Sequence, residues 1–313
     1  MPASFYLMHW GLSWLPPAYR DAWSWKAGLA LFFAGSSAMV LFLSAWEDWR
    51  GEHPRLAHTG MLAGLVGLVV MGILFIWDLG NPLRFWELMV YGWTQRLGSS
   101  WMPWGVLFMV LLGLAALVEG WGIREDSWRK PAAAATMLFG LLVTTYSGFE
   151  LADTSIALWN TYLPLVFLTV SLSIAGAFVP VLAGQIGDEG ARQRLVARYR
   201  TLTLVSLAST ALVLLFWLYT AGHLDGGRAL PTVDALLGGS LAGWFWAAVL
   251  LGLAAAALLW RASDRLTVQP AMRGAIFALT GSSGLILRLL IVLAGYHFFA
   301  PLSPFGVTHI ELP

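Results

Sequence analysis

A short stretch that interrupts a long apolar segment carries two residues suited to chemistry. The stretch Trp77–Phe85 reads WDLGNPLRF and places Asp78 and Arg84 on either side of a Gly-Asn-Pro turn. About twenty apolar residues precede it, so the turn is predicted at the end of a membrane-spanning helix. A carboxylate and a guanidinium at a membrane edge suit the binding of a polar head group or of a partner subunit. The alternative is a plain loop that ends the helix, in which the two side chains pair with each other.

A second group of polar side chains ends a later apolar segment. In the stretch TTYSGFELAD, Tyr146 and Glu150 stand four positions apart and share a helix face, and Asp153 follows on the next turn. Acidic groups and a tyrosine hydroxyl close to a membrane surface must be paired or hydrated. Taken alone, Tyr146 also fits an aromatic residue of the membrane interface. Because this group and the Asp78–Arg84 turn are predicted on the same side of the membrane, we expect a binding site there.

One arginine lies deep within an apolar segment. Arg288, in LILRLLIVLAG, is costly to bury unless it is paired or hydrated, so its side chain is predicted to face the interior of a helix bundle. It belongs either to a structural ion pair or to a proton path. Asp153 is a second candidate for such a path.

The composition points to a protein whose solvent is largely lipid. The chain has 313 residues, of which 58% are hydrophobic and 11% are charged, against about 25% charged residues in soluble domains. The net charge of +1 gives no sign of a nucleic-acid partner. The absence of cysteine excludes disulfides, thiolate metal sites and iron–sulfur clusters ligated by cysteines of this chain. The first 24 residues lack a basic region and a cleavage site, so we expect an interfacial segment and no signal peptide.

The elements that must position these residues are predicted to be eight membrane-spanning helices, since each apolar run is long enough to cross about 30 Å of hydrocarbon. The fold class is therefore an all-α, multi-pass integral membrane protein. A faint repeat, in which Trp25 and Trp159 each precede a similar apolar helix, predicts two four-helix bundles, over residues 1–155 and 156–313. The predicted spans are 26–46, 56–77, 101–122, 131–150, 162–184, 201–222, 241–261 and 273–298.

The basic residues predict the orientation of the chain. Five of them fall on one face, namely Arg20, Lys26, Arg84, Arg96 and Arg228. Twelve fall on the loops of the other face: Arg50, Arg55, Arg124, Arg129, Lys130, Arg192, Arg194, Arg198, Arg200, Arg261, Arg265 and Arg273. Basic loops stay in the cytoplasm, so both termini and the WDLGNPLRF turn are expected on the periplasmic side of a bacterial inner membrane.

Neither haem nor a metal ion is expected on this chain. Bis-histidine haem needs two imidazoles at matched depth inside helices, whereas the six histidines lie at or beyond the ends of the predicted spans. No P-loop, nucleophile-elbow or HExxH motif is present, so a soluble-enzyme mechanism has no support.

Several stretches resemble the NrfD/PsrC family of polytopic membrane anchors. The most specific are DLGNPLRF and WNTYLPLVF; weaker matches are SSWMPWGV at 99–106, the FFAG of the first span, TYSGFELA and LRLLIVLAG. The resemblance implies a quinone-reactive subunit that is not catalytic alone and carries no redox cofactor of its own. Its partners would be an iron–sulfur subunit and a molybdopterin catalytic subunit on the periplasmic face. Menaquinone or ubiquinone would be the exchangeable substrate.

The resemblance also assigns residues to the quinone site, which would lie in the first four-helix half. Tyr146 matches the family's pocket tyrosine, and Asp78 and Arg84 match its signature acid and arginine, with Glu150 beside them. Some members place Asn and His in the first turns of the first helix, where this chain has Lys26 as its polar residue. Two other function classes stay open on the sequence alone: a transporter, since interrupted helices and an intramembrane charge also mark transport paths, and a passive membrane scaffold.

Overall fold

The computed structural model describes residues 24–79, 81–95, 101–122, 128–154, 156–223, 227, 229–261 and 269–297. In these ranges every regular element is a helix. In chain order they are α3 (Trp25–Arg50), α4 (Pro54–Asp78), η1 (Pro82–Arg84), α5 (Trp86–Gln95), α6 (Met102–Gly122), α7 (Arg129–Ala152), α8 (Leu163–Phe178), η2 (Val179–Gln185), α9 (Glu189–His223), α10 (Leu230–Leu237), α11 (Ala242–Arg261) and α12 (Pro270–His297).

The prediction of eight spanning helices is confirmed. Eight helices in the described ranges are long and apolar enough to cross a membrane, and most begin and end within four residues of the predicted bounds. The exception is α9, which begins at Glu189 rather than at residue 201. Its first turns are rich in good helix formers, so the helix continues beyond the apolar run. With 35 residues it is about 52 Å long, well beyond the hydrocarbon thickness.

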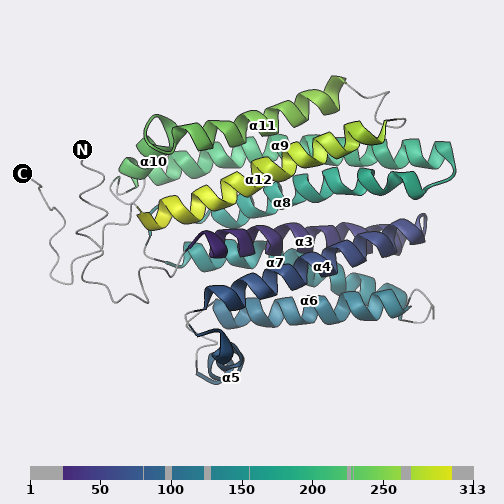
Figure 1. The fold of residues 1–313 in the computed structure, drawn as a ribbon, viewed down its shortest axis with the longest axis horizontal. Coiled ribbons are helices and arrows are strands. Elements are labelled where there is room, and N and C mark those ends of the chain that lie inside the picture. Colours follow the sequence, from purple (N-terminus) through teal and green to yellow (C-terminus); the bar gives the residue numbers. More distant parts are fainter. Residues whose placement is uncertain are drawn as a thin grey trace, which may run out of the picture.

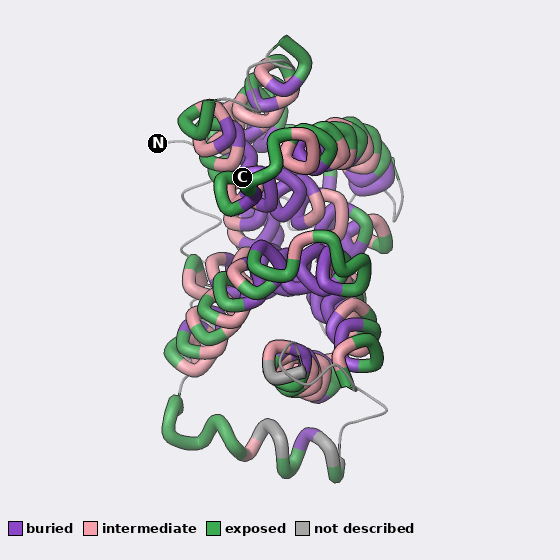
Figure 2. The backbone as a smooth tube through the Cα atoms, turned by 90° about the vertical axis from the view of Figure 1, so that its right-hand side faces the viewer, coloured by how far each residue is buried: buried purple, intermediate pink, exposed green. Residues whose placement is uncertain are grey.

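The helix α3 lies at the centre of the molecule. In its most apolar stretch 78% of the residues are buried, against 28% in α9 and 22% in α11, so these two helices mostly face outward. Figure 2 views the bundle nearly end-on and shows the buried residues gathered in the middle. α3 contacts α4 and α7 of its own half and α8 and α12 of the other half.

Small residues bring α4 close to α3. A Cβ atom at Gly64 would lie 2.6 Å from Leu41 Cγ, and Cβ atoms at Gly60 and Gly67 would overlap the hydroxyls of Ser44 and Ser37. The helix backbones can therefore approach closely, as small residues allow in membrane helices.

The stretch WNTYL connects α7 to α8 and holds the second half together. Trp159 Nε1 donates to the carbonyl of Ile291 in α12 at 2.8 Å, and Gly295 leaves room for the indole. Asn160 Nδ2 donates to the carbonyl of Trp217 in α9 at 3.0 Å. Trp159 and Asn160 therefore hold helices together, and these contacts account for both residues without a role in catalysis or ligand binding.

Two short helices occupy the longer connections and were not predicted. α5 runs across the direction of the spanning helices, at the end of the molecule where α4 ends (Figure 1 and Figure 2). Trp86, Val90 and Tyr91 in α5 are about half exposed, which fits a helix that lies along a membrane surface. The other helix, α10, packs on α9 and α11 at the same end.

The first spanning helix, α3, begins at one end of the molecule, and the last spanning helix, α12, finishes at that same end (Figure 1). That this end is periplasmic stays a prediction. The division into bundles at residue 155 also stays a prediction, because one core cluster draws Leu31 of α3 and Leu151 of α7 together with residues of α8, α9, α11 and α12.

Candidate functional site

Asp78 joins the end of α4 to the start of α3. Ser24, the N-cap residue of α3, donates its hydroxyl hydrogen to Asp78 Oδ1 at 2.6 Å. Lys26 Nζ lies 3.9 Å from the same oxygen and 5.2 Å from the centre of the Trp77 ring. Trp25 packs edge-on against Trp77, with 5.9 Å between ring centres. The carboxylate is thus held at the helix ends by a hydroxyl and an ammonium group, and Lys26 supplies a polar group in the first turn of α3.

Arg84 does not pair with Asp78. It lies in η1, its side chain is 62% exposed, and its Nε donates to Glu87 Oε1 at 2.5 Å. The expectation of a loop closed by an Asp78–Arg84 pair is therefore wrong, because the turn carries Arg84 toward the first residues of α5. Glu87 is a partner that the sequence analysis missed, although the spacing of three residues between Arg84 and Glu87 is a recognisable signal.

Tyr146 is the most buried of the residues predicted for the quinone site, with 4% of its surface exposed. Its ring packs directly over Gly105 of α6, where a Cβ atom would overlap the ring carbons. No hydrogen bond joins its hydroxyl to another group within the described part of the sequence. Glu150 acts on it electrostatically from the next turn of α7. The arrangement is a phenol and a carboxyl group in an apolar surrounding, near the end of a spanning helix.

Aromatic rings flank Tyr146 on the outer face of α6 and α7. Trp101 stacks on Phe149 with 5.3 Å between ring centres, and Phe149 is 45% exposed. Trp104 packs against Phe108 one turn further along α6. Of these rings, Phe149 and Trp104 are exposed, so they would face the lipid.

The predicted site residues therefore form separate groups at one end of the molecule. Asp78 and Lys26 form the first, Tyr146 and Glu150 the second, and Arg84 with Glu87 the third. The helix ends that carry them lie at the same end of the bundle (Figure 1). Asp153 is exposed at the C-cap of α7.

Arg288 lies in the interior, as predicted, and is not part of these three groups. It is 1% exposed, and its partners in the described residues are oxygens of α3 and α8 and no carboxylate. Nη1 donates to the Leu31 carbonyl at 3.2 Å, and Nη2 donates to the Phe167 carbonyl at 3.0 Å and to Ser171 Oγ at 2.8 Å. The guanidinium also lies 3.6 Å from the centre of the Phe167 ring. The contacts explain how this charge is tolerated; a proton path through Arg288 or Asp153 stays a prediction.

The opposite end of the bundle holds a buried ionic network that the sequence analysis missed. Asp48 is 1% exposed and pairs with Arg129 at 2.8 Å. Glu47 is fully buried and accepts hydrogen bonds from Arg198 at 3.0 Å and from the Tyr199 hydroxyl at 2.9 Å. These contacts tie α3 to α7 and α9. In the sequence, the run of charged residues at the end of the first predicted span could have indicated this network.

Glu119 is a second residue that the sequence analysis missed. It is fully buried in α6, and among the described residues neither of its carboxylate oxygens has a hydrogen-bond partner of good geometry. The Thr136 hydroxyl lies close to it, and Asp48 and Arg129 act on it electrostatically. The sequence does show Glu119 as an acidic residue within an apolar run, and this was the signal that could have identified it.

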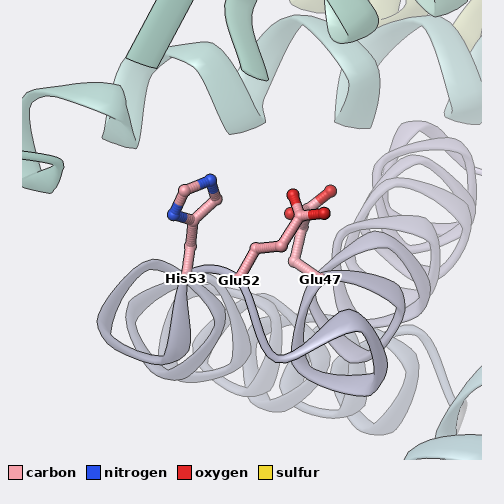
Figure 3. Close-up of side chains that lie close together, drawn as sticks. All are labelled: Glu47, Glu52 and His53. Carbon is pink, nitrogen blue, oxygen red and sulfur yellow. The ribbon is translucent and has the colours of Figure 1, made fainter. Parts of the chain in front are cut away.

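A group of three possible metal ligands lies at the same end, between α3 and α4. Ligand atoms of Glu47, Glu52 and His53 lie within 4.8 Å of one another (Figure 3). However, Arg198 pairs with both glutamates, at 3.0 Å and 3.2 Å, and Arg50 pairs with Glu52. The hydrogen bond from Arg50, with a further one from Arg198, lowers the pKa of Glu52. The arginines therefore already supply the positive charge that a metal ion would bring.

Comparison with known proteins agrees with the resemblance seen in the sequence. A similar protein is the C subunit of polysulfide reductase from Wolinella succinogenes, which is 28% identical over 261 residues, covering 74% of this chain and 80% of the relative. The sequence model of the family described as "Polysulphide reductase, NrfD" matches residues 17–300. With the eight apolar helices of the fold, this match shows that the chain is a multi-pass membrane protein that belongs to the NrfD family of polysulfide reductase subunits.

Proposed function

We propose that this protein is the quinone-reactive membrane subunit of a respiratory oxidoreductase complex in a bacterial inner membrane. The single observation that carries the proposal is the Tyr146 side chain, which is buried near the end of α7, with Glu150 one turn away and exposed aromatic rings on the adjoining surface of α6 and α7. The relative's name, which makes it one subunit of polysulfide reductase, supports a place in a reductase complex of several subunits. An iron–sulfur subunit and a molybdopterin catalytic subunit would complete that complex on the side of α5 and Asp78.

The chemistry of a quinone fits these groups. Its ring and tail are apolar and enter from lipid, while its two carbonyls need hydrogen-bond donors and, on reduction, two protons. The Tyr146 hydroxyl donates to one carbonyl, and Glu150 exchanges protons with the reduced quinol. Two electrons pass between the quinone and a cluster in the iron–sulfur partner as two protons are taken up or released. Asp153, exposed one turn beyond Glu150, is placed to pass those protons to water.

The polar turn at the end of α4 contributes to the same side. Asp78 and Lys26 form a charged edge beside the start of α3, and Arg84 is exposed with Glu87 at the start of α5. Exposed charges of both signs suit the docking of a soluble partner subunit, where they fix its register. In this proposal Tyr146 and Glu150 serve the quinone, while the turn around Arg84 serves the partner.

The experiment measures the turnover of one preparation of the assembled Tyr146→Phe complex in two assays, one with a quinone or quinol and one with a soluble redox dye. Loss of one hydrogen bond to a buried carbonyl, at about 1.4 kcal/mol, slows quinone-linked turnover roughly tenfold. Activity with a soluble dye, which bypasses the membrane subunit, should not change. Tyr162→Phe is the matched control, since Tyr162 lies at the same end and its ring stacks on Phe216 in the other half.

Gly105→Ala gives an independent perturbation, because the added methyl would displace the Tyr146 ring. It should also lower quinone-linked turnover selectively. Equal losses with dye and quinone in both variants would mean that Tyr146 is structural and that the pocket lies elsewhere. A stable protein that binds no partner and catalyses uptake into vesicles would favour a transporter.

A further inference from the structure

Near the basic end of the second half, one arginine is buried and pairs with no carboxylate of the described residues. Arg273 lies in the first turn of α12 and is 4% exposed, yet its Nε and Nη1 atoms have no hydrogen-bond partner among the residues that the structure describes. Guanidinium nitrogens that are buried without a hydrogen-bond partner carry a desolvation cost. The position of Arg273 adds to the cost, because the positive end of the α12 dipole lies beside it.

A second arginine increases the local positive charge. Arg192 of α9 repels Arg273 electrostatically, and its own Nε is also buried without a partner. Its only described ion pair is with Glu189, at 3.6 Å, and Glu189 is 63% exposed. Two guanidinium groups and a helix N-terminus thus lie close together, and the one described carboxylate that pairs with either arginine is the exposed Glu189.

Arg273 lines a pocket that is partly open to the outside. Its enclosed part has a volume of only about 10 Å³, so a group larger than a water molecule would lie at its open mouth. Arg200 also lines it, held in place by a hydrogen bond from Nε to the Leu259 carbonyl at 2.7 Å. Its remaining walls are apolar or hydroxyl-bearing side chains of α8, η2, α9, α11 and α12, and none of its lining residues carries a carboxylate.

The pocket lies at the level where apolar helix segments give way to polar ones. Arg200, Leu259 and Arg273 stand at the ends of the apolar runs of α9, α11 and α12. Next to Leu259, Trp260 is 72% exposed, as expected for a tryptophan at the membrane interface. The first turns of α9 continue beyond this level. A ligand in the pocket would therefore meet the head-group layer of the leaflet on the basic side.

We propose that this pocket binds a phosphate group, with Arg273 as the principal donor and Arg192 and Arg200 as flanking charges. Guanidinium groups bind phosphate through paired hydrogen bonds, and basic pockets between membrane helices bind anionic lipid head groups. The source of the phosphate is expected to be an anionic phospholipid, because the pocket lies at head-group level. The proposal is independent of the quinone site, which lies at the other end of the bundle.

The test measures lipid binding to the full-length protein, purified with any subunits that accompany it. Native mass spectrometry would count phosphatidylglycerol and phosphatidylcholine molecules retained by the wild type and by Arg273→Gln. The wild type should retain phosphatidylglycerol in preference, and Arg273→Gln should bind it about tenfold more weakly. Arg273→Lys should keep part of the binding. Arg194→Gln removes the same charge from a side chain that is 74% exposed and outside the pocket, and should bind as the wild type does.

Thermal unfolding separates the two sources of phosphate. Phosphatidylglycerol in nanodiscs should raise the unfolding temperature of the wild type, but not that of Arg273→Gln, relative to phosphatidylcholine nanodiscs. If millimolar inorganic phosphate gives the same Arg273-dependent shift in phosphatidylcholine nanodiscs, the site binds soluble phosphate as well. If Arg273→Gln fails to accumulate, the comparison rests on Arg273→Lys and Arg194→Gln. Equal phosphatidylglycerol retention by wild type and the Arg273 variants, or no preference for it in the wild type, would overturn the proposal.

Discussion

Replacing Gly35 with alanine should displace the Arg288 guanidinium from its partners. A Cβ atom at Gly35 would lie 2.6 Å from Arg288 Nη2 and 2.5 Å from Ser171 Oγ, which is too close for either to stay in place. Nη2 would then lose its hydrogen bonds to Ser171 and to the Phe167 carbonyl. Hydrogen bonds from a charged group contribute about 1.5–3 kcal/mol each, so the loss is roughly 3–6 kcal/mol. Alanine regains about 1 kcal/mol in helix propensity, which leaves a net cost of about 2–5 kcal/mol.

The control and the assay follow from the same geometry. Gly72 of α4 has no atom near its Cβ direction, so Gly72→Ala should leave stability unchanged or raise it by up to about 1 kcal/mol. Unfolding in a denaturing-detergent titration would rank the purified variants. The expected order, from most to least stable, is Gly72→Ala, wild type and Gly35→Ala.

A double variant decides whether Arg288 is the cause. Methionine is flexible and apolar, so Gly35→Ala should cost far less in an Arg288→Met background than alone. The two changes should thus be non-additive by at least about 2 kcal/mol. An equal cost of Gly35→Ala in both backgrounds would refute the reasoning, because the strain would then lie somewhere other than at the guanidinium.

Three further predictions concern the orientation of the chain and the ionic contacts at its basic end. A reporter inserted at Gly51 should behave as cytoplasmic and one fused after Pro313 as periplasmic, because basic loops stay inside; the reverse pattern would overturn the orientation. Arg129→Gln leaves the Asp48 carboxylate buried without its partner and should cost about 3–5 kcal/mol, whereas exposed Arg194→Gln should change stability by under about 0.5 kcal/mol in the same titration. The lowered pKa of Glu52 means that its stabilising contribution is present at neutral pH and is lost as the pH falls below about 4, so Glu52→Gln should flatten that part of the stability-versus-pH curve.

The spanning helices could be predicted because long apolar runs are their direct sequence signal. α5 and α10 were missed because helices of ten and eight residues leave no such run. The early start of α9 was missed for a related reason, since a hydropathy window ends where the charged turns begin. Each of these errors concerns a helical segment that lies outside the long apolar runs.

The candidate site could be predicted only in part. Helical periodicity placed Tyr146 and Glu150 on one face, and the depth of Arg288 predicted its burial. The partners of Arg288 are mostly backbone carbonyls, which leave no trace in a sequence. Arg84 turned toward Glu87 because of the geometry of η1, which the residue types alone do not specify. The role of Gly105, which leaves room for the Tyr146 ring, became clear only from the structure.

The central claim is that a quinone binds beside Tyr146, between α6 and the end of α7. The most direct measurement is photolabelling of the assembled complex with an azido-quinone, followed by mass-spectrometric mapping of the labelled peptides. We predict labels within residues 101–109 and 145–153, suppressed by excess unreactive quinone and reduced in Gly105→Ala. Competable labels confined to α8–α12, or labels that excess quinone does not suppress, would contradict a quinone site at Tyr146.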